Sequence, residues 1–238
     1  MADLIVLCGG RGTRLGSLTE NTPKPLLPVE GRPFLLHLLL RMKEQGFNRI
    51  LLAAHYLPDL FEAFLSQYSD LLPGVELIVE PKPLGTGGAL AFAGKQVHAP
   101  SFVAMNGDSW VSQPIAPVLE EHERFRRKLT FVAVKARSVE GGAVQKGFWK
   151  LDSEERPVGF TPSAAAEEGW VNAGLYVLDR QVVASWPEGA YSLEENLSSM
   201  IRGVSAGLYR SDGRLLDIGT PELYEWANRS WGETAHAY

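Results

Sequence analysis

Glycine, arginine and lysine residues are concentrated just after the first apolar run of the chain. Residues 4–7 read Leu-Ile-Val-Leu, and residues 9–14 continue as Gly-Gly-Arg-Gly-Thr-Arg. Glycines let a backbone turn sharply and bring its N–H groups close to a ligand, and arginines match phosphate charges. Lys24 follows between two prolines, which stiffen the backbone around it. The segment predicts a triphosphate-binding loop with Arg14 and Lys24 as its cations; a tight turn with solvated arginines is the competing interpretation.

Two common phosphate-binding loops do not match this segment. The Gly-Lys-Ser/Thr ending of a P-loop is missing. Gly10, Gly12 and Gly16 miss the spacing of the dinucleotide fingerprint by one residue, and prolines interrupt the region where its helix would follow. We therefore disfavour an NAD-dependent reductase.

A second glycine-rich segment, residues 83–89, reads Pro-Leu-Gly-Thr-Gly-Gly-Ala and follows an expected strand. Its glycines suit a helix N-terminus that a flat base or a phosphate approaches closely, although a plain helix-opening turn explains them as well. Glu80 precedes the segment, and its carboxylate can accept hydrogen bonds from the ring N–H and the amine of guanine. A solvated strand end is the competing interpretation for Glu80.

Two aspartates are candidate ligands for a divalent cation. Asp108 follows an apolar run at residues 102–105, and Asp217 lies within another at residues 215–218. Ligands of open α/β sheets bind beyond the carboxyl ends of the strands, which is where Asp108 is expected. Two carboxylates that met there would hold Mg²⁺, which prefers oxygen ligands and substrate phosphates. Their separation along the chain leaves open whether they meet.

Strand and helix patterns alternate through the first half of the chain. Strands are expected at residues 4–7, 50–53, 75–79, 102–105 and 129–134. Helices are expected at residues 34–45, 60–68, 86–95 and 120–128. Such alternation predicts a parallel sheet with helices on both faces.

The second half of the chain is less regular and richer in strands. Strands are expected at residues 144–151, 171–178, 208–209 and 215–218, and helices at residues 193–201 and 221–230. No linker-like segment or internal repeat separates the halves. We predict an α/β fold, with a Rossmann-like, mostly parallel mixed sheet flanked by helices and a small β-rich second portion.

Composition limits the classes of partner. The chain has 238 residues and a net charge of −5, which does not suit a surface that coats nucleic acid. Cys8 is the only cysteine, so a reducing compartment is natural. The N-terminus lacks the signal-peptide pattern, and His37 interrupts the apolar stretch at residues 34–40, which is too short to span a bilayer. We expect a cytoplasmic protein without nucleic-acid or membrane partners.

Six motifs, in this order, resemble those of the sugar-1-phosphate nucleotidyltransferases. They extend from Leu7 to Glu222 and read Leu-x-Gly-Gly-x-Gly-Thr-Arg-Leu, Pro-Lys-Pro, Pro-Leu-Gly-Thr-Gly-Gly-Ala, Asn-Gly-Asp, Val-Asn-Ala-Gly-Leu-Tyr and Asp-Ile-Gly-Thr-Pro-Glu. Within that family, residues 83–89 and the short length most resemble the D-glycero-α-D-manno-heptose 1-phosphate guanylyltransferases.

The resemblance implies a reaction. A nucleotidyl group would pass from an NTP, with GTP favoured, to a sugar 1-phosphate, with the heptose favoured, and pyrophosphate would leave. The product would serve surface polysaccharide synthesis. The alternatives are mannose 1-phosphate as acceptor, uridylyl or thymidylyl transfer, and a regulatory subunit that binds nucleotide sugars without turnover.

The resemblance also implies roles for individual residues. The catalytic residues would be Arg14, Lys24 and Asp108, and the Mg²⁺ ligands would be Asp108 and Asp217. The nucleotide would contact Leu7, Gly9, Gly10, Gly12, Glu80, Gly85 and Thr86. The sugar phosphate would contact Asn172, Gly174, Glu194 and Lys146. We assign residues 1–135 to a nucleotide-binding half and residues 136–238 to a sugar-phosphate-binding half of one domain, residues 1–238, and the sequence leaves a homo-oligomer open.

One family motif is absent. The family carries Phe-x-Glu-Lys-Pro before its Val-Asn-Ala-Gly strand, and that lysine binds the sugar phosphate, whereas residues 159–163 here read Gly-Phe-Thr-Pro-Ser. We expect Lys146 or Lys150 to replace it. The attacking phosphate oxygen is already ionised at neutral pH because its second pKa is about 6, so no general base is needed. Catalysis is then expected to rest on positioning and charge neutralisation.

Overall fold

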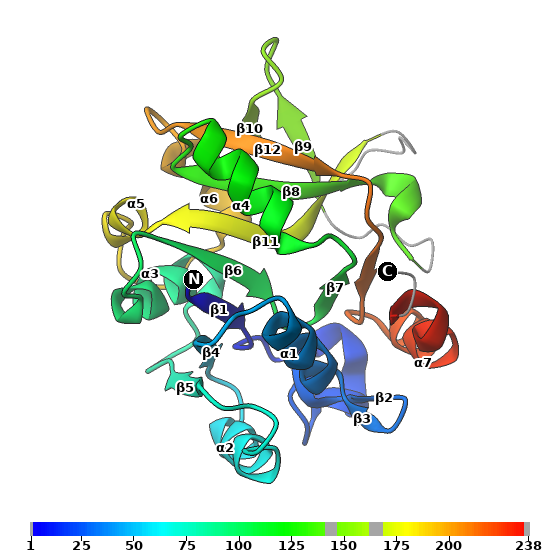
Figure 1. Cartoon of the computed structure of the whole chain (residues 1–238). Helices are drawn as coiled ribbons and strands as arrows, with labels where there is room; N and C mark the ends of the chain where they lie inside the picture. The colour runs from blue at the N-terminus through cyan, green and yellow to red at the C-terminus, as the bar shows by residue number, and fades with distance from the viewer. Residues whose placement is uncertain (1, 141–146, 162–168, 236–238) are drawn as a thin grey trace.

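The computed structural model describes residues 2–140, 147–161 and 169–235. A nine-stranded mixed sheet runs through it in the order β10-β9-β11-β6-β1-β4-β5, and β8 pairs with both β11 and β12 (Figure 1). The strands are β1 (Leu4–Leu7), β4 (Ile50–Ala54), β5 (Val75–Val79), β6 (Ser101–Asn106), β8 (Leu129–Lys135), β9 (Phe148–Leu151), β10 (Pro157–Thr161), β11 (Trp170–Asp179) and β12 (Ala206–Ser211).

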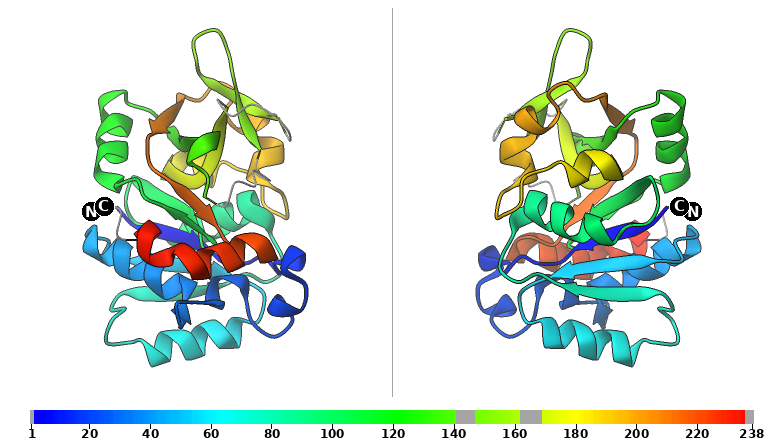
Figure 2. Two further views of the ribbon diagram at one scale, coloured as in Figure 1. Left: turned by 90° about the vertical axis from the view of Figure 1, so that its right-hand side faces the viewer. Right: turned by 90° about the vertical axis from the view of Figure 1, so that its left-hand side faces the viewer.

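The first half forms the parallel part of the sheet, as its alternating pattern predicts. β6, β1, β4 and β5 are parallel neighbours. The connecting helices are α1 (Phe34–Glu44), α2 (Pro58–Gln67) and α3 (Gly85–Ala93). Leu4 and Val6 of β1 pack in one apolar cluster with the residues of α1, whereas Ile5 packs in a second cluster with Leu90 of α3. The sheet is therefore covered on both faces, as Figure 2 shows, and its central strands β1 and β4 are apolar throughout.

The second half extends this sheet mainly with antiparallel strands. β11 pairs antiparallel with β6 and with β8, and β12 pairs parallel with β8. β9 and β10 form an antiparallel hairpin at the upper edge in Figure 1. The predicted fold class, a mixed sheet flanked by helices with a β-rich second portion, is confirmed. Strands from both predicted halves share the one sheet. The division of the domain after residue 135 stays a prediction.

Helix α4 differs from its prediction at both ends. It spans Ile115–Arg124 rather than residues 120–128. Ile115, Val118 and His122 are its buried side, so its apolar stripe starts before the charged run that suggested a helix. Arg126 has φ of 49°, a left-handed conformation that a helix does not continue.

The remaining elements are shorter. The other helices are α5 (Arg180–Ala184), α6 (Leu193–Met200) and α7 (Pro221–Ala235). Two small sheets pair β2 (Pro28–Val29) with β3 (Arg32–Pro33), and β7 (Ser109–Val111) with β13 (Leu215–Asp217). Residues 144–146 of the strand predicted at 144–151 lie outside the described residues. Within the part of the chain that the structure covers, no helix has the length and apolarity needed to cross a membrane.

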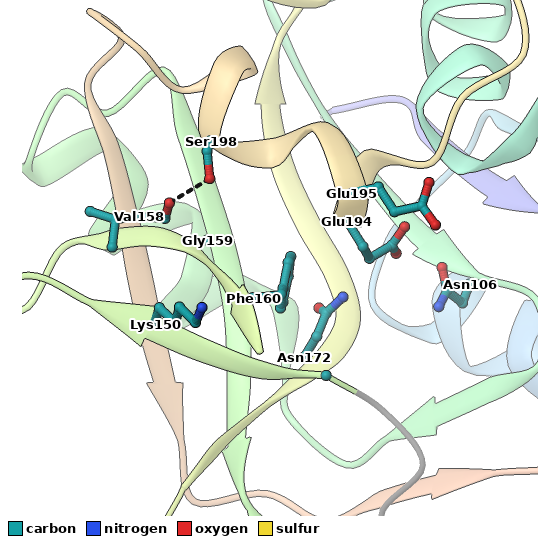
Figure 3. Close-up of a pocket in the computed structure, with 10 residues that line it drawn as sticks. Asn106, Lys150, Val158, Gly159, Phe160, Asn172, Glu194, Glu195 and Ser198 are labelled. Carbon is teal, nitrogen blue, oxygen red and sulfur yellow. Dashed lines mark hydrogen bonds between the residues drawn. The ribbon is translucent and has the colours of Figure 1, made fainter. Parts of the chain in front are cut away.

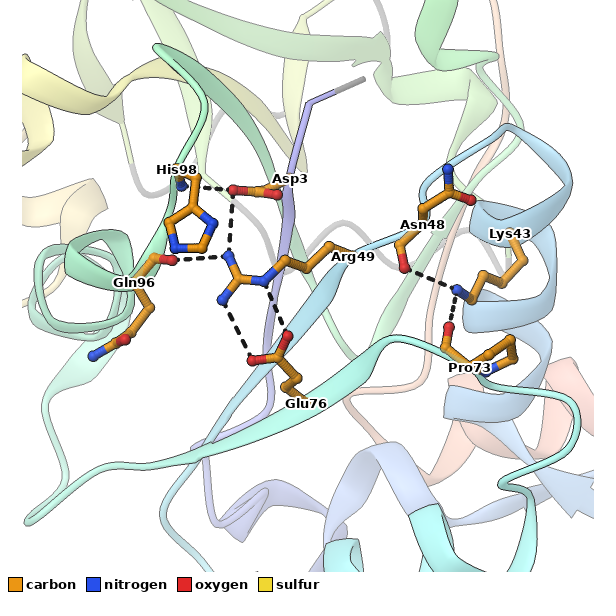
Figure 4. Close-up of polar contacts among 8 residues, drawn as sticks. All are labelled: Asp3, Lys43, Asn48, Arg49, Pro73, Glu76, Gln96 and His98. Carbon is orange, nitrogen blue, oxygen red and sulfur yellow. Dashed lines mark hydrogen bonds and ion pairs between the residues drawn. The ribbon is translucent and has the colours of Figure 1, made fainter.

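Arg49 ties several segments together at the amino ends of the parallel strands (Figure 4). Its Nη1 donates to the Gln96 carbonyl at 2.8 Å and lies 3.4 Å from Asp3 Oδ2, and its Nε donates to Glu76 Oε1 at 2.9 Å. The same Asp3 oxygen accepts from the backbone N–H of His98 at 2.8 Å. These contacts hold the sheet edge opposite the carboxyl ends of the strands, where the candidate site lies.

Candidate active site

The carboxyl ends of β1 and β6 open into a cavity of about 350 Å³, called here the nucleotide cavity. It contains every residue that the sequence assigns to the nucleotide, namely Leu7, Gly9, Gly10, Gly12, Glu80, Gly85 and Thr86. Two predicted catalytic residues, Lys24 and Asp108, line it as well. Parallel strands end on the same side of the sheet, so the loops after them converge at one place.

Lys24 and the two aspartates meet at one end of this cavity. Lys24 Nζ forms an ion pair with Asp108 Oδ2. Ser109 Oγ lies 3.0 Å from Asp108 Oδ1 and 3.1 Å from Asp217 Oδ2, so one hydroxyl is within hydrogen-bond distance of both carboxylates. Asp217 arrives there because β13 pairs with β7, which puts Asp217 opposite Ser109. The meeting that the sequence left open is therefore present.

The charges in this cluster support one another. Burial by itself lowers the pKa of Lys24, but the carboxylates of Asp108 and Asp217 outweigh burial and raise that pKa above its usual value. The Lys24 side chain is only 11% exposed. Lys24 is therefore a fixed positive charge at neutral pH, aimed at the place where the two carboxylates converge.

The loop after β1 is held by hydrogen bonds to one carbonyl. Gly12 has φ of 65°, and its carbonyl accepts from the Leu15 N–H at 2.9 Å and from Thr19 Oγ1 at 3.0 Å. A Cβ at Gly12 would lie 3.2 Å from the Lys24 Cβ, so the loop and the lysine are in close contact. Glycine is required here by both the left-handed conformation and the lack of space.

Arg14 lies on the short 3-10 helix Thr13–Thr19 that follows this loop. A Cβ built on Gly219 would lie 2.4 Å from Asp217 Oδ1 and 3.3 Å from Arg14 Nη2. The guanidinium is thus on the Asp217 side of the cluster, and Arg14 is not among the described residues that line the nucleotide cavity.

Glu80 is buried rather than solvated. Its side chain is at the edge of the cavity, and the residue is only 3% exposed. Oε2 accepts from the backbone N–H of Leu84 at 3.1 Å, whereas Oε1 is buried with no hydrogen-bond partner among the described residues. Burial raises the pKa of Glu80 above its usual value, while the hydrogen bond from the Leu84 N–H opposes that shift. An unpaired buried acceptor facing a cavity fits a ligand that carries N–H groups.

The glycines of the second segment are approached by the chain itself. A Cβ on Gly87 would lie 2.2 Å from Tyr191 Cε2, and one on Gly88 would lie 2.0 Å from the Gly189 carbonyl oxygen. The N–H groups of Gly87 and Gly88 both point at the Tyr191 carbonyl, at 3.1 and 3.4 Å. The expectation that a base or phosphate fills this space is wrong for these two glycines, because the segment before α6 occupies it. Gly85 still lines the nucleotide cavity.

Cys8 has a packing role. It is 1% exposed, and burial, followed by the charges of Asp108 and Glu80, raises the pKa of its thiol far above the usual value. The thiol stays protonated and is a poor nucleophile.

A second cavity of about 810 Å³, drawn in Figure 3, shares Asn106 with the first. It is called here the sugar cavity, after the substrate predicted for the residues in it. Its described lining comes from β6, β9, β10, β11 and α6, and consists of Asn106, Gly147, Lys150, Val158, Gly159, Phe160, Asn172, Glu194, Glu195 and Ser198. Two of the predicted sugar-phosphate residues, Asn172 and Glu194, are thus in the same cavity. Asn172 is held in the irregular part of β11, with its Nδ2 donating to the Tyr176 hydroxyl at 2.9 Å and its Oδ1 accepting from the Gly174 N–H at 3.1 Å.

Asn106 is the described residue that lines both cavities. Its Oδ1 is buried and has no hydrogen-bond partner among the described residues. Gly174 makes room for it, since a Cβ there would lie 2.5 Å from Asn106 Nδ2. The sequence motifs assign no separate role to Asn106, although its place before Gly107-Asp108 at a strand end is a usable signal. Phe160, Glu195 and Ser198 carry no such signal in the sequence.

Of the two lysines expected to replace the family's sugar-phosphate lysine, the structure describes one. Lys146, the residue predicted to bind the sugar phosphate, lies outside the described residues. Lys150, the other candidate, is exposed on β9 and lines the sugar cavity. Figure 3 shows Lys150 at the side of the cavity away from Asn106.

The donor set suits a hard cation. Asp108 and Asp217 supply carboxylate oxygens on either side of the Ser109 hydroxyl, and both face the cluster that contains Lys24. No group of three or more acidic, histidine or cysteine side chains suited to a metal occurs within residues 2–140, 147–161 and 169–235. A cation held by these two residues would therefore need phosphate or water oxygens as further ligands.

The sequence of this chain is similar to those of known nucleotidyltransferases. A family model described as nucleotidyl transferase matches residues 4–232. The mannose-1-phosphate guanylyltransferase of Mycobacterium tuberculosis is 36% identical over 233 residues, which are 92% of this chain and 62% of that protein, so the chain spans less than two thirds of that relative. The D-glycero-alpha-D-manno-heptose 1-phosphate guanylyltransferase of Campylobacter jejuni is 28% identical over 223 residues, which are 92% of this chain and 96% of that protein.

Solved structures show the same fold. HddC from Yersinia pseudotuberculosis superposes with a TM-score of 0.84 at 27% identity, covering 97% of this chain and 100% of that one. The same protein complexed with GMP-PN gives a TM-score of 0.82 at 26% identity and the same coverage. With its six motifs, the paired aspartates beside Lys24 and a family match over nearly its whole length, this chain belongs to the nucleotidyl transferase family.

Proposed function

We propose that this protein transfers a guanylyl group from GTP to D-glycero-α-D-manno-heptose 1-phosphate, giving GDP-heptose and pyrophosphate for surface polysaccharide synthesis. One observation carries the proposal: two cavities share Asn106 and meet beside the cluster of Lys24 and Asp108. A reaction between two phosphorylated substrates needs such a junction. The relatives named heptose guanylyltransferases and the GMP-PN complex of HddC support the choice of substrates.

We infer that guanine lies against Glu80. The unpaired Oε1 can accept from the ring N–H and the 2-amino group of guanine, while Oε2 stays with Leu84. Uracil and thymine present one ring N–H between two carbonyl oxygens, and a carboxylate repels these oxygens. This contact is the part of the site that favours GTP over UTP or TTP.

We propose Asp108 and Asp217 as the ligands of Mg²⁺. Their carboxylates fit this hard cation, which supplies positive charge to the α-phosphate when bound. Lys24 and Arg14 offset the charge that develops on the departing pyrophosphate. The sugar phosphate attacks the α-phosphorus in line, its oxygen already ionised, while Asn172 and Glu194 orient the sugar.

Mannose 1-phosphate is the second candidate acceptor. The higher identity, 36% against 28%, favours it, whereas the length match, 62% against 96% of the relative, favours the heptose. Neither difference is a contact with the sugar, so the two acceptors are compared directly in the experiment.

The test is a matrix of four nucleoside triphosphates and several sugar 1-phosphates, scored for pyrophosphate release. We expect the highest kcat/KM for GTP with the heptose 1-phosphate, and no turnover after Mg²⁺ is removed with a chelator. A preference for mannose 1-phosphate would correct the acceptor, and a preference for UTP or TTP would refute the role of Glu80. Binding of nucleotide sugars without any pyrophosphate release would show a regulatory subunit instead. The cytoplasmic location and any homo-oligomer stay predictions of the sequence.

A further inference from the structure

Thr86 lines the nucleotide cavity, but its hydroxyl is already used by another part of the chain. Thr86 Oγ1 donates to Glu194 Oε2 at 2.7 Å and accepts from the Leu193 N–H at 2.8 Å. A threonine hydroxyl has a single proton. In this arrangement Thr86 therefore has no proton to donate to a nucleotide, although the sequence resemblance places it among the nucleotide contacts.

Glu194 is held from two sides. Its Oε2 also accepts from Ser192 Oγ at 2.8 Å, and that hydroxyl caps α6 by accepting from the Glu195 N–H at 3.2 Å. Among the described residues, no hydrogen bond uses the other oxygen, Oε1, of Glu194. Glu194 lines the sugar cavity, where Figure 3 shows it between Phe160 and Asn106. Two hydroxyls thus fix one carboxylate oxygen and leave the other for a ligand.

Backbone hydrogen bonds also join α3 to the segment before α6, in addition to the bond from the Leu193 N–H to Thr86. The Tyr191 N–H donates to the Leu84 carbonyl at 2.9 Å, and the Gly87 N–H donates to the Tyr191 carbonyl at 3.1 Å. The glycines of α3 fit closely against residues 189–191. Loss of the Thr86 hydroxyl therefore removes its bonds to Glu194 and to the Leu193 N–H, whereas the backbone bonds between α3 and Tyr191 remain.

We propose that Thr86 and Ser192 are positioning residues for Glu194, so that Thr86 controls binding of the sugar phosphate rather than of the nucleotide. This inference rests on the proposed function, because it needs the large cavity to hold the sugar. Glu194, the carboxylate that would receive a sugar hydroxyl, is then oriented by Thr86, which lies at the start of α3 beside the nucleotide cavity.

The test compares Thr86→Val with Thr86→Ser. Valine keeps the shape and removes the hydroxyl, whereas serine keeps the hydroxyl. For Thr86→Val we expect the KM for the sugar phosphate to rise roughly tenfold, as for loss of a hydrogen bond to a charged group. The KM for GTP and its dissociation constant, measured by calorimetry, should stay within about twofold, and Thr86→Ser should restore the sugar-phosphate KM.

Either of two results would overturn the inference: a weakened affinity for GTP with an unchanged KM for the sugar phosphate, or no change in either. If Thr86→Val does not fold, Ser192→Ala tests the same carboxylate from its other side and should also raise the sugar-phosphate KM. Failure of the proposed function would be visible in the wild type, as absent pyrophosphate release, before any variant is compared.

Discussion

Replacement of Glu80 by glutamine tests how the protein selects its base. The Oε2 atom accepts from Leu84 N–H at 3.1 Å, so a glutamine at this position keeps its oxygen toward Leu84. Its NH₂ group then occupies the place of Oε1, which is buried and unpaired among the described residues. In Glu80→Gln a donor would face the ring N–H and 2-amino group of guanine, and attraction would become repulsion.

The magnitude follows from the hydrogen bonds that are lost. A hydrogen bond to a charged group contributes about 1.5–3 kcal/mol, so kcat/KM for GTP should fall roughly 10- to 100-fold. The assay is pyrophosphate release with GTP and with inosine triphosphate, which lacks the 2-amino group. The wild type should prefer GTP to inosine triphosphate, and Glu80→Gln should lose most of that preference while its use of UTP rises relative to GTP.

The same contact has a pH dependence. Only the ionised carboxylate accepts from both donors, and burial raises the pKa of Glu80 above its usual value. The wild-type kcat/KM for GTP should therefore fall on the acid side at a higher pH than an ordinary glutamate would cause, and this limb should be absent in Glu80→Gln. A Glu80→Gln enzyme that uses GTP within twofold of the wild type would refute the reasoning.

Five other variants, one of them a control, test the rest of the site. Lys24→Met removes the buried charge, and we expect kcat to fall roughly 100- to 1,000-fold in the pyrophosphate assay; a tenfold or smaller loss contradicts its role. Asp217→Asn should raise the Mg²⁺ concentration for half-maximal rate by roughly tenfold or more, and an unchanged Mg²⁺ titration would remove Asp217 from the metal site. Gly87→Ala places a methyl group 2.2 Å from a tyrosine ring carbon and should lower stability by about 1–3 kcal/mol in thermal melts, while Gly10→Ala, with nothing within 4 Å, keeps the melting temperature. Asn106→Ala should lower kcat/KM for both substrates, and an effect on one alone would place it away from the junction.

Much of the fold could be predicted from the chain itself. The strands at residues 4–7 and 75–79 have the predicted bounds, and α1 ends one residue before its predicted end. The first strand is entirely apolar, the strand at 75–79 follows Gly74, and α1 follows Pro33 and ends shortly before Gly46, so local preference and burial agree. The helix predicted from the charged run at residues 120–128 has the wrong bounds, because charge marks only the solvated side of a helix. Ile115 and Val118 on the buried side decide where α4 begins.

The candidate site could be predicted only as separate pieces. Each glycine loop, Lys24 and Asp108 carry signals in their own neighbourhood. The second aspartate joins the first through a pairing of β7 with β13, segments more than a hundred residues apart. The role of Asn106 depends likewise on two cavities that several strands form together.

The sequence by itself determined the parallel strands and the helices between them, and which residues have side chains suited to phosphate and a hard cation. Only the tertiary structure decided that Asp217 reaches Asp108, that Tyr191 rather than a ligand lies against Gly87, and that the Thr86 hydroxyl belongs to Glu194. The physical reason is range. Backbone preference and apolar periodicity act over a few neighbouring residues, whereas these contacts arise from strand register and core packing, to which the whole chain contributes.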